Sequence, residues 1–151
     1  MKLFGLIGLD ANSRRSVLVR LVDALAKRQI KVATLHEAPP GFDPDRPGKD
    51  SYEHRKAGAF EVLLMAPHIS ALMHENGQRP PPSAEDLARA MPEAELVLID
   101  GFENQAHPKV RVGSLAGEVR CDASVIASID AAQLDIEALA DLVLARAKEV
   151  G

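Results

Sequence analysis

The sequence predicts an α/β fold, a mostly parallel sheet flanked by helices, with an added β-hairpin. Residues 2–7 are an apolar run of strand length, and a helical pattern and a second short strand follow, which is the order of a βαβ unit. Residues 96–99 are a continuous apolar run, typical of a strand buried on both faces of a parallel sheet. The apolar runs 60–65 and 69–73 are separated by only three residues, a spacing that predicts the hairpin.

The remaining elements of the first half follow from periodicity and turn residues. Apolar residues recur at helical spacing after the first strand, with charged residues on the opposite face: Val17, Leu18, Leu21, Val22 and Leu25. This pattern predicts a helix that begins near Arg14, and residues 31–35 predict the second strand. Residues 36–49 hold four prolines and two glycines and must form a loop. Residues 50–58 predict a short helix with Asp50 or Ser51 as its cap.

The second half continues the alternation of helices and strands. A proline-rich connector over 78–82 leads to a helix that Ser83 caps and that runs to Met91. Short strands are expected over 109–112 and 124–128. Apolar residues at helical spacing then predict a C-terminal amphipathic helix: Ile136, Leu139, Ala140, Val143 and Ala147.

Composition limits the class of protein. A chain of 151 residues suits a single domain over 1–151, and a hydrophobic fraction of 46% supports a globular core. The net charge of −4 gives no basic surface for nucleic acid. No apolar run has the length of a membrane helix, and Cys121 has no second cysteine to pair with, so we expect a cytoplasmic protein without a membrane partner.

Residues 8–16 lie where a phosphate-binding loop of sequence G-x-x-x-x-G-K-[ST] would lie, between the first strand and its helix. In such loops, backbone amides and the helix N-terminus bind phosphate. The candidate phosphate-binding residues are therefore Gly8, Asn12, Ser13, Arg14, Arg15 and Ser16. The simpler alternative is that these residues are only a turn that leads into a helix with a basic start.

The loop departs from the motif at three positions. Ser13 replaces the second glycine, where the backbone must approach phosphate closely. Arg14 replaces the lysine with a planar guanidinium, and Arg15 replaces the hydroxyl residue that binds Mg²⁺. Asp10 adds a negative charge inside the loop. We therefore expect no appreciable GTP or ATP hydrolysis, although anions can still meet Arg14 and Arg15 at the helix start.

A segment after the second strand carries a specific resemblance. It reads Gly41-Phe42-Asp43-Pro44-Asp45-Arg46-Pro47-Gly48-Lys49-Asp50-Ser51-Tyr52, followed by Arg55-Lys56-Ala57-Gly58-Ala59. It resembles the G-F-D-x-D-x-P-G-K-D-S-Y…R-x-A-G-A signature of the molybdopterin-guanine dinucleotide biosynthesis protein B family, MobB. Further blocks resemble the family in the same order along nearly the whole chain: 71–75, 96–102, 109–110 and 125–128.

This resemblance implies a fold, ligands and partners. The family is similar to P-loop NTPases in fold, tends to be dimeric, and is associated with GTP binding and weak GTPase activity. It assists a nucleotidyl transferase that attaches a nucleotide to molybdopterin. The ligands implied are GTP with Mg²⁺, and molybdopterin or its guanine dinucleotide form. The partners implied are that transferase or a molybdoenzyme, and a second copy of the chain, which the apolar hairpin also favours.

Two departures from the family bear on its chemistry. The family's loop usually reads G-x-x-G-S-G-K-T-T, and its second strand is followed by a K-H-x-H-H cluster, where this chain has His36-Glu37-Ala38-Pro39-Pro40. Joint loss at both places favours a noncatalytic accessory or adapter protein of molybdenum cofactor biosynthesis or molybdoenzyme maturation. The alternative is a working GTP-binding member with low GTPase activity.

The remaining site candidates lie outside the loop. The residues Lys49, Asp50 and Ser51 form a second segment that can face a phosphate or a partner; alternatively, Asp50 only caps a helix. Asp100 ends the buried strand, where a carboxylate linked to Mg²⁺ would lie; alternatively, it serves the turn. The histidines show no metal-ligand spacing.

Overall fold

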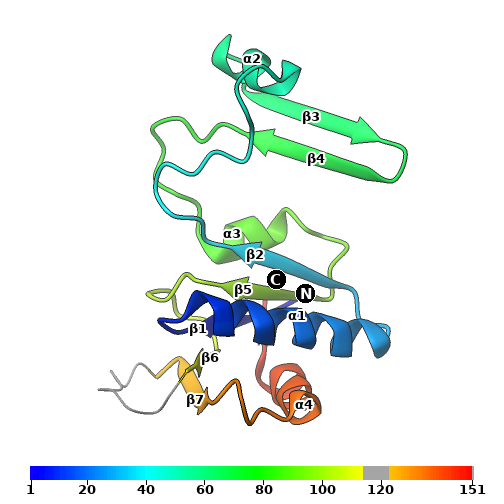
Figure 1. Ribbon diagram of the computed structural model, residues 1–151, viewed down its shortest axis with the longest axis vertical. Helices are drawn as coiled ribbons and strands as arrows, with labels where there is room; N and C mark the ends of the chain where they lie inside the picture. The colour runs from blue at the N-terminus through cyan, green and yellow to red at the C-terminus, as the bar shows by residue number, and fades with distance from the viewer. Residues whose placement is uncertain (114–122, 151) are drawn as a thin grey trace. The chain divides into compact units, whose positions relative to one another are not determined.

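The computed structural model describes residues 1–113 and 123–150 (Figure 1). The contacts within the chain divide it into two compact units. Unit 1 comprises Met1–Glu37 and Pro82–Gly151, and unit 2 comprises Ala38–Pro81.

Unit 1 is built on a mostly parallel sheet, as the sequence predicts. Its strands are β1 (Lys2–Ile7), β2 (Val32–His36), β5 (Leu96–Asp100), β6 (Lys109–Val112), β7 (Val125–Ile129) and β8 (Lys148–Glu149). The order is β2-β5-β1-β6-β7 with every pair parallel, and the two-residue β8 pairs antiparallel with β1. The short β8 was not predicted, because two residues carry no periodicity.

Helices cover both faces of this sheet. On one face, α1 (Ala11–Lys27) and α4 (Ile136–Arg146) pack over a core of twelve buried residues that includes Phe4 and Leu98. On the other face, α3 (Ala84–Arg89) packs its buried alanines against Val97 and Ile99. All five residues of β5 are buried, as expected for a strand with helices on both sides.

The first helix begins earlier than predicted. The sequence pattern placed its start near Arg14, whereas α1 starts at Ala11 with Asp10 as its N-cap. The Asp10 side chain accepts hydrogen bonds from the amides of Asn12 and Ser13, which fixes the first turn. The apolar pattern missed this turn because its residues are polar or exposed.

Several strands of unit 1 end at the same edge of the sheet. Gly8 follows β1 with φ +142°, and a Cβ atom there would lie 2.1 Å from the Val112 carbonyl oxygen. Only glycine fits this position, because the backbone conformation and the contact both exclude a side chain. Asp100 ends β5 and His36 ends β2, and the two residues are register partners. The edge therefore gathers the ends of β1, β2 and β5.

Unit 2 contains the hairpin and a short helix. The helix is α2 (Asp50–Lys56), and the hairpin pairs β3 (Glu61–Ala66) with β4 (Ile69–His74) in antiparallel register. The hairpin was predicted within one residue at each end. The predicted cap of α2 is wrong: its N-cap is Lys49, which makes no side-chain capping bond.

The hairpin leaves a large apolar surface exposed. Only Val62 among its residues is buried, while five large apolar side chains are exposed: Leu63, Leu64, Met65, Ile69 and Leu72.

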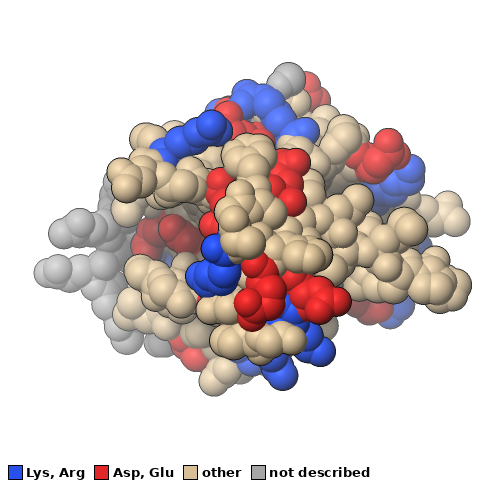
Figure 2. All heavy atoms as spheres, turned by 90° about the horizontal axis from the view of Figure 1, so that it is seen from above, with Lys and Arg blue, Asp and Glu red and all other residues tan. Residues whose placement is uncertain are grey.

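Figure 2 shows Lys and Arg mixed with Asp and Glu on one side of the molecule, beside broad uncharged areas. Within the described ranges, no helix is both long enough and apolar enough to cross a membrane.

Candidate functional site

The start of α1 already holds a carboxylate of its own chain. Asp10 Oδ1 accepts from the Asn12 amide at 3.1 Å, and Oδ2 accepts from the Ser13 amide at 3.2 Å. The Ser13 hydroxyl also donates to Oδ2. This hydroxyl, with the Asn12 amide, lowers the pKa of Asp10 below its usual value, so the side chain is anionic at neutral pH. The amides that would bind a phosphate are thus paired with Asp10.

The guanidinium at the lysine position is also engaged within the chain. Arg14 Nε lies 2.7 Å from Asp100 Oδ1, and Arg14 Nη1 donates to the Gly8 carbonyl oxygen. The side chains of Arg14 and Asp100 are only 18% and 9% exposed, so water screens this ion pair weakly. The cation that would bind phosphate is therefore neutralised by the end of β5.

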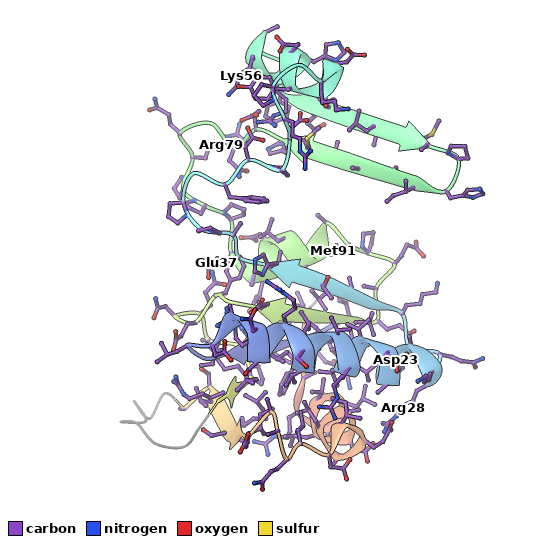
Figure 3. The ribbon with its side chains drawn as sticks, in the orientation of Figure 1. Asp23, Arg28, Glu37, Lys56, Arg79 and Met91 are labelled. Atoms are coloured by element: carbon purple, nitrogen blue, oxygen red, sulfur yellow. The ribbon has the colours of Figure 1, made fainter. Side chains whose placement is uncertain are left out.

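Two residues that the sequence reasoning did not select join this edge. His36 Nδ1 lies 2.9 Å from Asp100 Oδ2, so Asp100 binds an arginine and a histidine with its two oxygens. Glu37 Oε2 accepts from the Phe102 amide at 2.6 Å, and Figure 3 shows Glu37 where the chain leaves β2. The sequence signal available for His36 and Glu37 was their position at the end of the second strand, at the place of the family's basic cluster.

Asp100 does not fit a magnesium role in this arrangement. Mg²⁺ requires oxygen ligands in octahedral geometry, whereas both Asp100 oxygens face nitrogen donors. The Arg14 guanidinium beside the carboxylate would also repel a divalent cation. In the part of the chain that the structure describes, no group of three His, Cys, Asp or Glu side chains could hold a metal ion.

The structure brings together most, but not all, of the candidates from the loop. Ser13 and Arg14 join the network at the sheet edge directly, and Gly8 contributes its carbonyl oxygen. Asn12 contributes its backbone amide, and Arg15 and Ser16 are exposed on the first turns of α1. The edge thus offers exposed polar groups around a core that is already paired.

The second candidate segment lies in unit 2 and has a different character. Lys49 and Asp50 are exposed, whereas Ser51 is buried and its hydroxyl donates to Asp45 Oδ1 at 3.1 Å. Ser51 therefore has a structural contact rather than a surface for a ligand. Lys49 and Asp50 stay candidates.

The signature around this segment is an ion-pair network centred on Arg55. Arg55 Nη1 and Nη2 donate to the two oxygens of Asp43 at 2.8 and 3.0 Å, and Nε donates to Glu75 Oε1 at 2.7 Å. Asp45 Oδ2 lies 3.5 Å from Nη1. The Arg55 guanidinium lowers the pKa of Asp43 to about 2. The D-x-D and R positions of the signature thus join the loop before α2 to the residue after β4.

Known proteins resemble this chain over most of its length. The family model described as "Molybdopterin guanine dinucleotide synthesis protein B" matches residues 3–131. A "Molybdopterin-guanine dinucleotide biosynthesis adapter protein" of Escherichia coli is 32% identical over 89% of this chain and 87% of its own length. A protein of the same name from Haemophilus influenzae is 29% identical over 72% of this chain and 61% of its own length.

Solved structures share the fold. A crystal structure of a molybdopterin-guanine biosynthesis protein B (mobB) has a TM-score of 0.72 at 18% identity and covers 95% of this chain and 97% of its own. Bacillus subtilis MobB has a TM-score of 0.69 at 17% identity and covers 98% and 99%. These likenesses confirm the mostly parallel sheet with flanking helices and an added hairpin.

Proposed function

Because the chain belongs to the MobB family, we propose that it is an accessory protein, an adapter, of molybdenum cofactor biosynthesis or molybdoenzyme maturation, with weak or lost GTPase activity. Relatives that are similar over most of the chain bear the name of adapter proteins of molybdopterin-guanine dinucleotide biosynthesis, which supports the pathway. The proposed partner is the nucleotidyl transferase of that pathway or a molybdoenzyme.

The observation that carries the loss of chemistry is the Arg14–Asp100 ion pair. Phosphoryl transfer depends on a cation and a metal that stabilise charge on the transferred group. Here Arg14, the cation at the lysine position, lies 2.7 Å from the Asp100 carboxylate that ends β5, and Asp10 binds the loop amides. A nucleotide would have to break both interactions before it could bind in a reactive geometry.

A working GTP site with low GTPase activity is the second candidate. The exposed Arg15 and Ser16 at the start of α1 favour it, since a guanidinium and a hydroxyl there could bind a phosphate that displaces Asp10. GTP, Mg²⁺ and the molybdenum cofactor are the ligands that distinguish the two candidates.

Calorimetric titration tests these proposals. We expect no turnover of GTP with Mg²⁺ and no heat of GTP binding that Arg15→Ala removes, because the loop amides and Arg14 are already paired. We also expect the immobilised chain to capture the pathway's transferase or a molybdoenzyme. Micromolar binding of GTP, with turnover that Arg14→Ala abolishes, would establish the second candidate instead. If the chain captures no protein of this pathway and binds neither GTP nor the cofactor, the pathway proposal is wrong.

We further propose that the protein is a homodimer that uses the hairpin. A two-stranded sheet with apolar side chains exposed on it is marginal by itself, and a second copy would cover that surface.

A further inference from the structure

An open pocket lies within unit 2, between the loop before α2 and the residues that follow β4. Its volume of about 480 Å³ is in the range of small-molecule sites. The residues that matter for its chemistry are Phe42, Asp43, Arg55, Leu72, Glu75 and Asn76. All of them belong to the segment Ala38–Pro81, so the pocket depends on this unit alone.

The charged groups in the polar wall of the pocket offer acceptors rather than donors. Nε, Nη1 and Nη2 of Arg55 already donate to Glu75 and Asp43. Three carboxylates, those of Asp43, Glu75 and Asp45, surround this one guanidinium. Lys56 also acts on Asp43 but does not line the pocket, so the charged groups that line it are two carboxylates and the paired guanidinium. The pKa of Asp43 near 2 keeps that carboxylate ionised at neutral pH. A phosphate is therefore disfavoured here, and a group that donates N–H bonds is favoured.

Glu75 is the acceptor best placed for a ligand. Its side chain is 46% exposed and binds Arg55 Nε through Oε1. A carboxylate accepts about four hydrogen bonds through its two oxygens, so a ligand with two adjacent N–H groups can bind beside Arg55. The neighbouring Asn76 amide also lines the pocket and can donate to a ring carbonyl.

The apolar part of the pocket suits a flat ring. Phe42 is 62% exposed and Leu72 is 61% exposed, although both are large apolar side chains. A planar heteroaromatic ring that stacks on Phe42 and contacts Leu72 would remove this surface from water. A ligand for this pocket must stack on an aromatic ring and donate two adjacent N–H bonds. An aminopyrimidinone meets both requirements, whereas an aliphatic amine cannot stack.

We propose that this pocket binds the 2-amino-4-oxopyrimidine ring that guanine and pterins share, with Glu75 accepting from the ring N–H and the 2-amino group and Phe42 stacking on the ring. The proposal rests on the proposed function, because the name of the family's product, molybdopterin-guanine dinucleotide, contains this ring system twice. The phosphates of such a ligand would remain outside the pocket.

Binding of unphosphorylated ligands by the full chain tests the proposal without involving the loop of unit 1. Guanosine and pterin should bind saturably, as measured by chemical-shift changes at Phe42 and Asn76. Inosine and lumazine lack the 2-amino group, and each should bind at least about tenfold more weakly than its parent, because Glu75 then loses a donor. Equal binding of guanosine and inosine, or no saturable binding of guanosine and pterin, would overturn the proposal.

Variants of the two contact residues sharpen the test. Glu75→Gln keeps an oxygen for Arg55 and removes the charged acceptor, so it should weaken guanosine binding at least about tenfold while Tm stays near that of the parent. Glu53→Gln is the matched control, because Glu53 lies on α2 and does not line the pocket. This variant should bind guanosine with the affinity of the parent chain. Phe42→Ala should also weaken binding. An unchanged affinity in Glu75→Gln contradicts the proposed contact.

Two further outcomes separate this inference from the proposed function. If N-acetylarginine amide competes as well as guanosine, the pocket binds a cationic side chain and the ring proposal is wrong. If guanosine and pterin fail to bind but the chain still captures its transferase, only the pocket is overturned. If they bind while no pathway protein is captured, the pocket stands and the adapter role fails.

Discussion

At the scale of single residues, the candidate site is defined by side chains that satisfy one another. Asp10, Arg14, His36 and Asp100 form two short networks at one edge of the sheet. Each charged group has a partner of opposite charge or a hydrogen-bond donor within the chain. Without that partner it would attract an external ligand. These contacts support the proposal that the residues of the candidate phosphate loop stabilise the fold and perform little nucleotide chemistry.

The Arg14–Asp100 pair should contribute measurably to stability. Replacement of Arg14 by Met removes one of the two side chains that pair with the nearly buried Asp100 carboxylate and leaves it with His36. We expect Arg14→Met to lower the free energy of unfolding by roughly 2–4 kcal/mol, because an uncompensated charge remains. In denaturant unfolding, the double variant Arg14→Met with Asp100→Asn should lose less free energy of unfolding than the sum of the losses in the two single variants. Additive effects would show that the pair does not interact.

The pKa of Asp43 gives a pH prediction with a definite sign. Its pKa is lowered in the folded chain from 3.8 to about 2 by the Arg55 guanidinium, so ionised Asp43 stabilises the fold. This contribution is complete above pH 4 and is lost as the pH falls through 2. Asp43→Asn should lower Tm at pH 5 but have little effect near pH 2. An equal loss at both values would show that the Arg55 pairing does not depend on the charge of Asp43.

At the scale of elements, short connections fix where the functional groups lie. Asp10 starts α1, and Arg28 after its last turn pairs with Glu137 and Asp141 of α4 at 2.5 and 2.6 Å, which ties the two helices of one face together. Figure 3 labels Arg28 at that end of α1. On the sheet itself, the buried Lys109 Nζ donates to the carbonyls of the turn between β5 and β6.

The turn from β1 to α1 should tolerate no side chain at Gly8. Its φ of +142° strains any other residue, and a Cβ atom would lie 2.1 Å from the Val112 carbonyl oxygen. We expect Gly8→Ala to lower the free energy of unfolding by about 2 kcal/mol or more, measured by denaturant titration. Gly48→Ala is the control, because its φ is also positive but a Cβ there meets no atom within 4 Å. If both changes cost the same, strain alone and not the contact determines the effect.

At the scale of the whole molecule, two compact units carry different properties. Unit 1 holds the sheet and the paired loop, and unit 2 holds the hairpin, the Arg55 network and the open pocket. The expectation that residues 1–151 form a single domain stays a prediction. Limited proteolysis tests it, because cleavage confined to the junctions near Glu37 and Pro82 would show that the units behave independently.

The apolar surface of the hairpin should determine assembly. Leu63, Met65 and Ile69 carry exposed side chains on the hairpin, and none of them lines the pocket of unit 2. We expect the parent chain to sediment as a dimer at micromolar concentrations, and Leu63→Glu with Met65→Glu to sediment as a monomer with its circular dichroism unchanged. The charge-matched control is Val19→Glu with Ala132→Glu in unit 1, which should remain dimeric. A monomeric parent would contradict the proposed assembly.

The sequence by itself determined the elements and the family. Apolar runs, helical spacing and turn residues located the main strands, the helices and the hairpin, because these signals are local. The signature around Lys49 and Asp50 identified the MobB family, which the match over residues 3–131 confirmed.

Only the tertiary structure decided what the polar residues do. Arg14 and Asp100 are 86 residues apart in the chain, and Arg55 and Glu75 are 20 apart. No spacing rule predicts such pairs, since a side chain's partner depends on which strand ends lie side by side after folding. For that reason the sequence predicted a phosphate loop that departs from its motif, but not the partners of its residues. The fold shows that Asp10 accepts from the amides of the loop and that Asp100 pairs with Arg14.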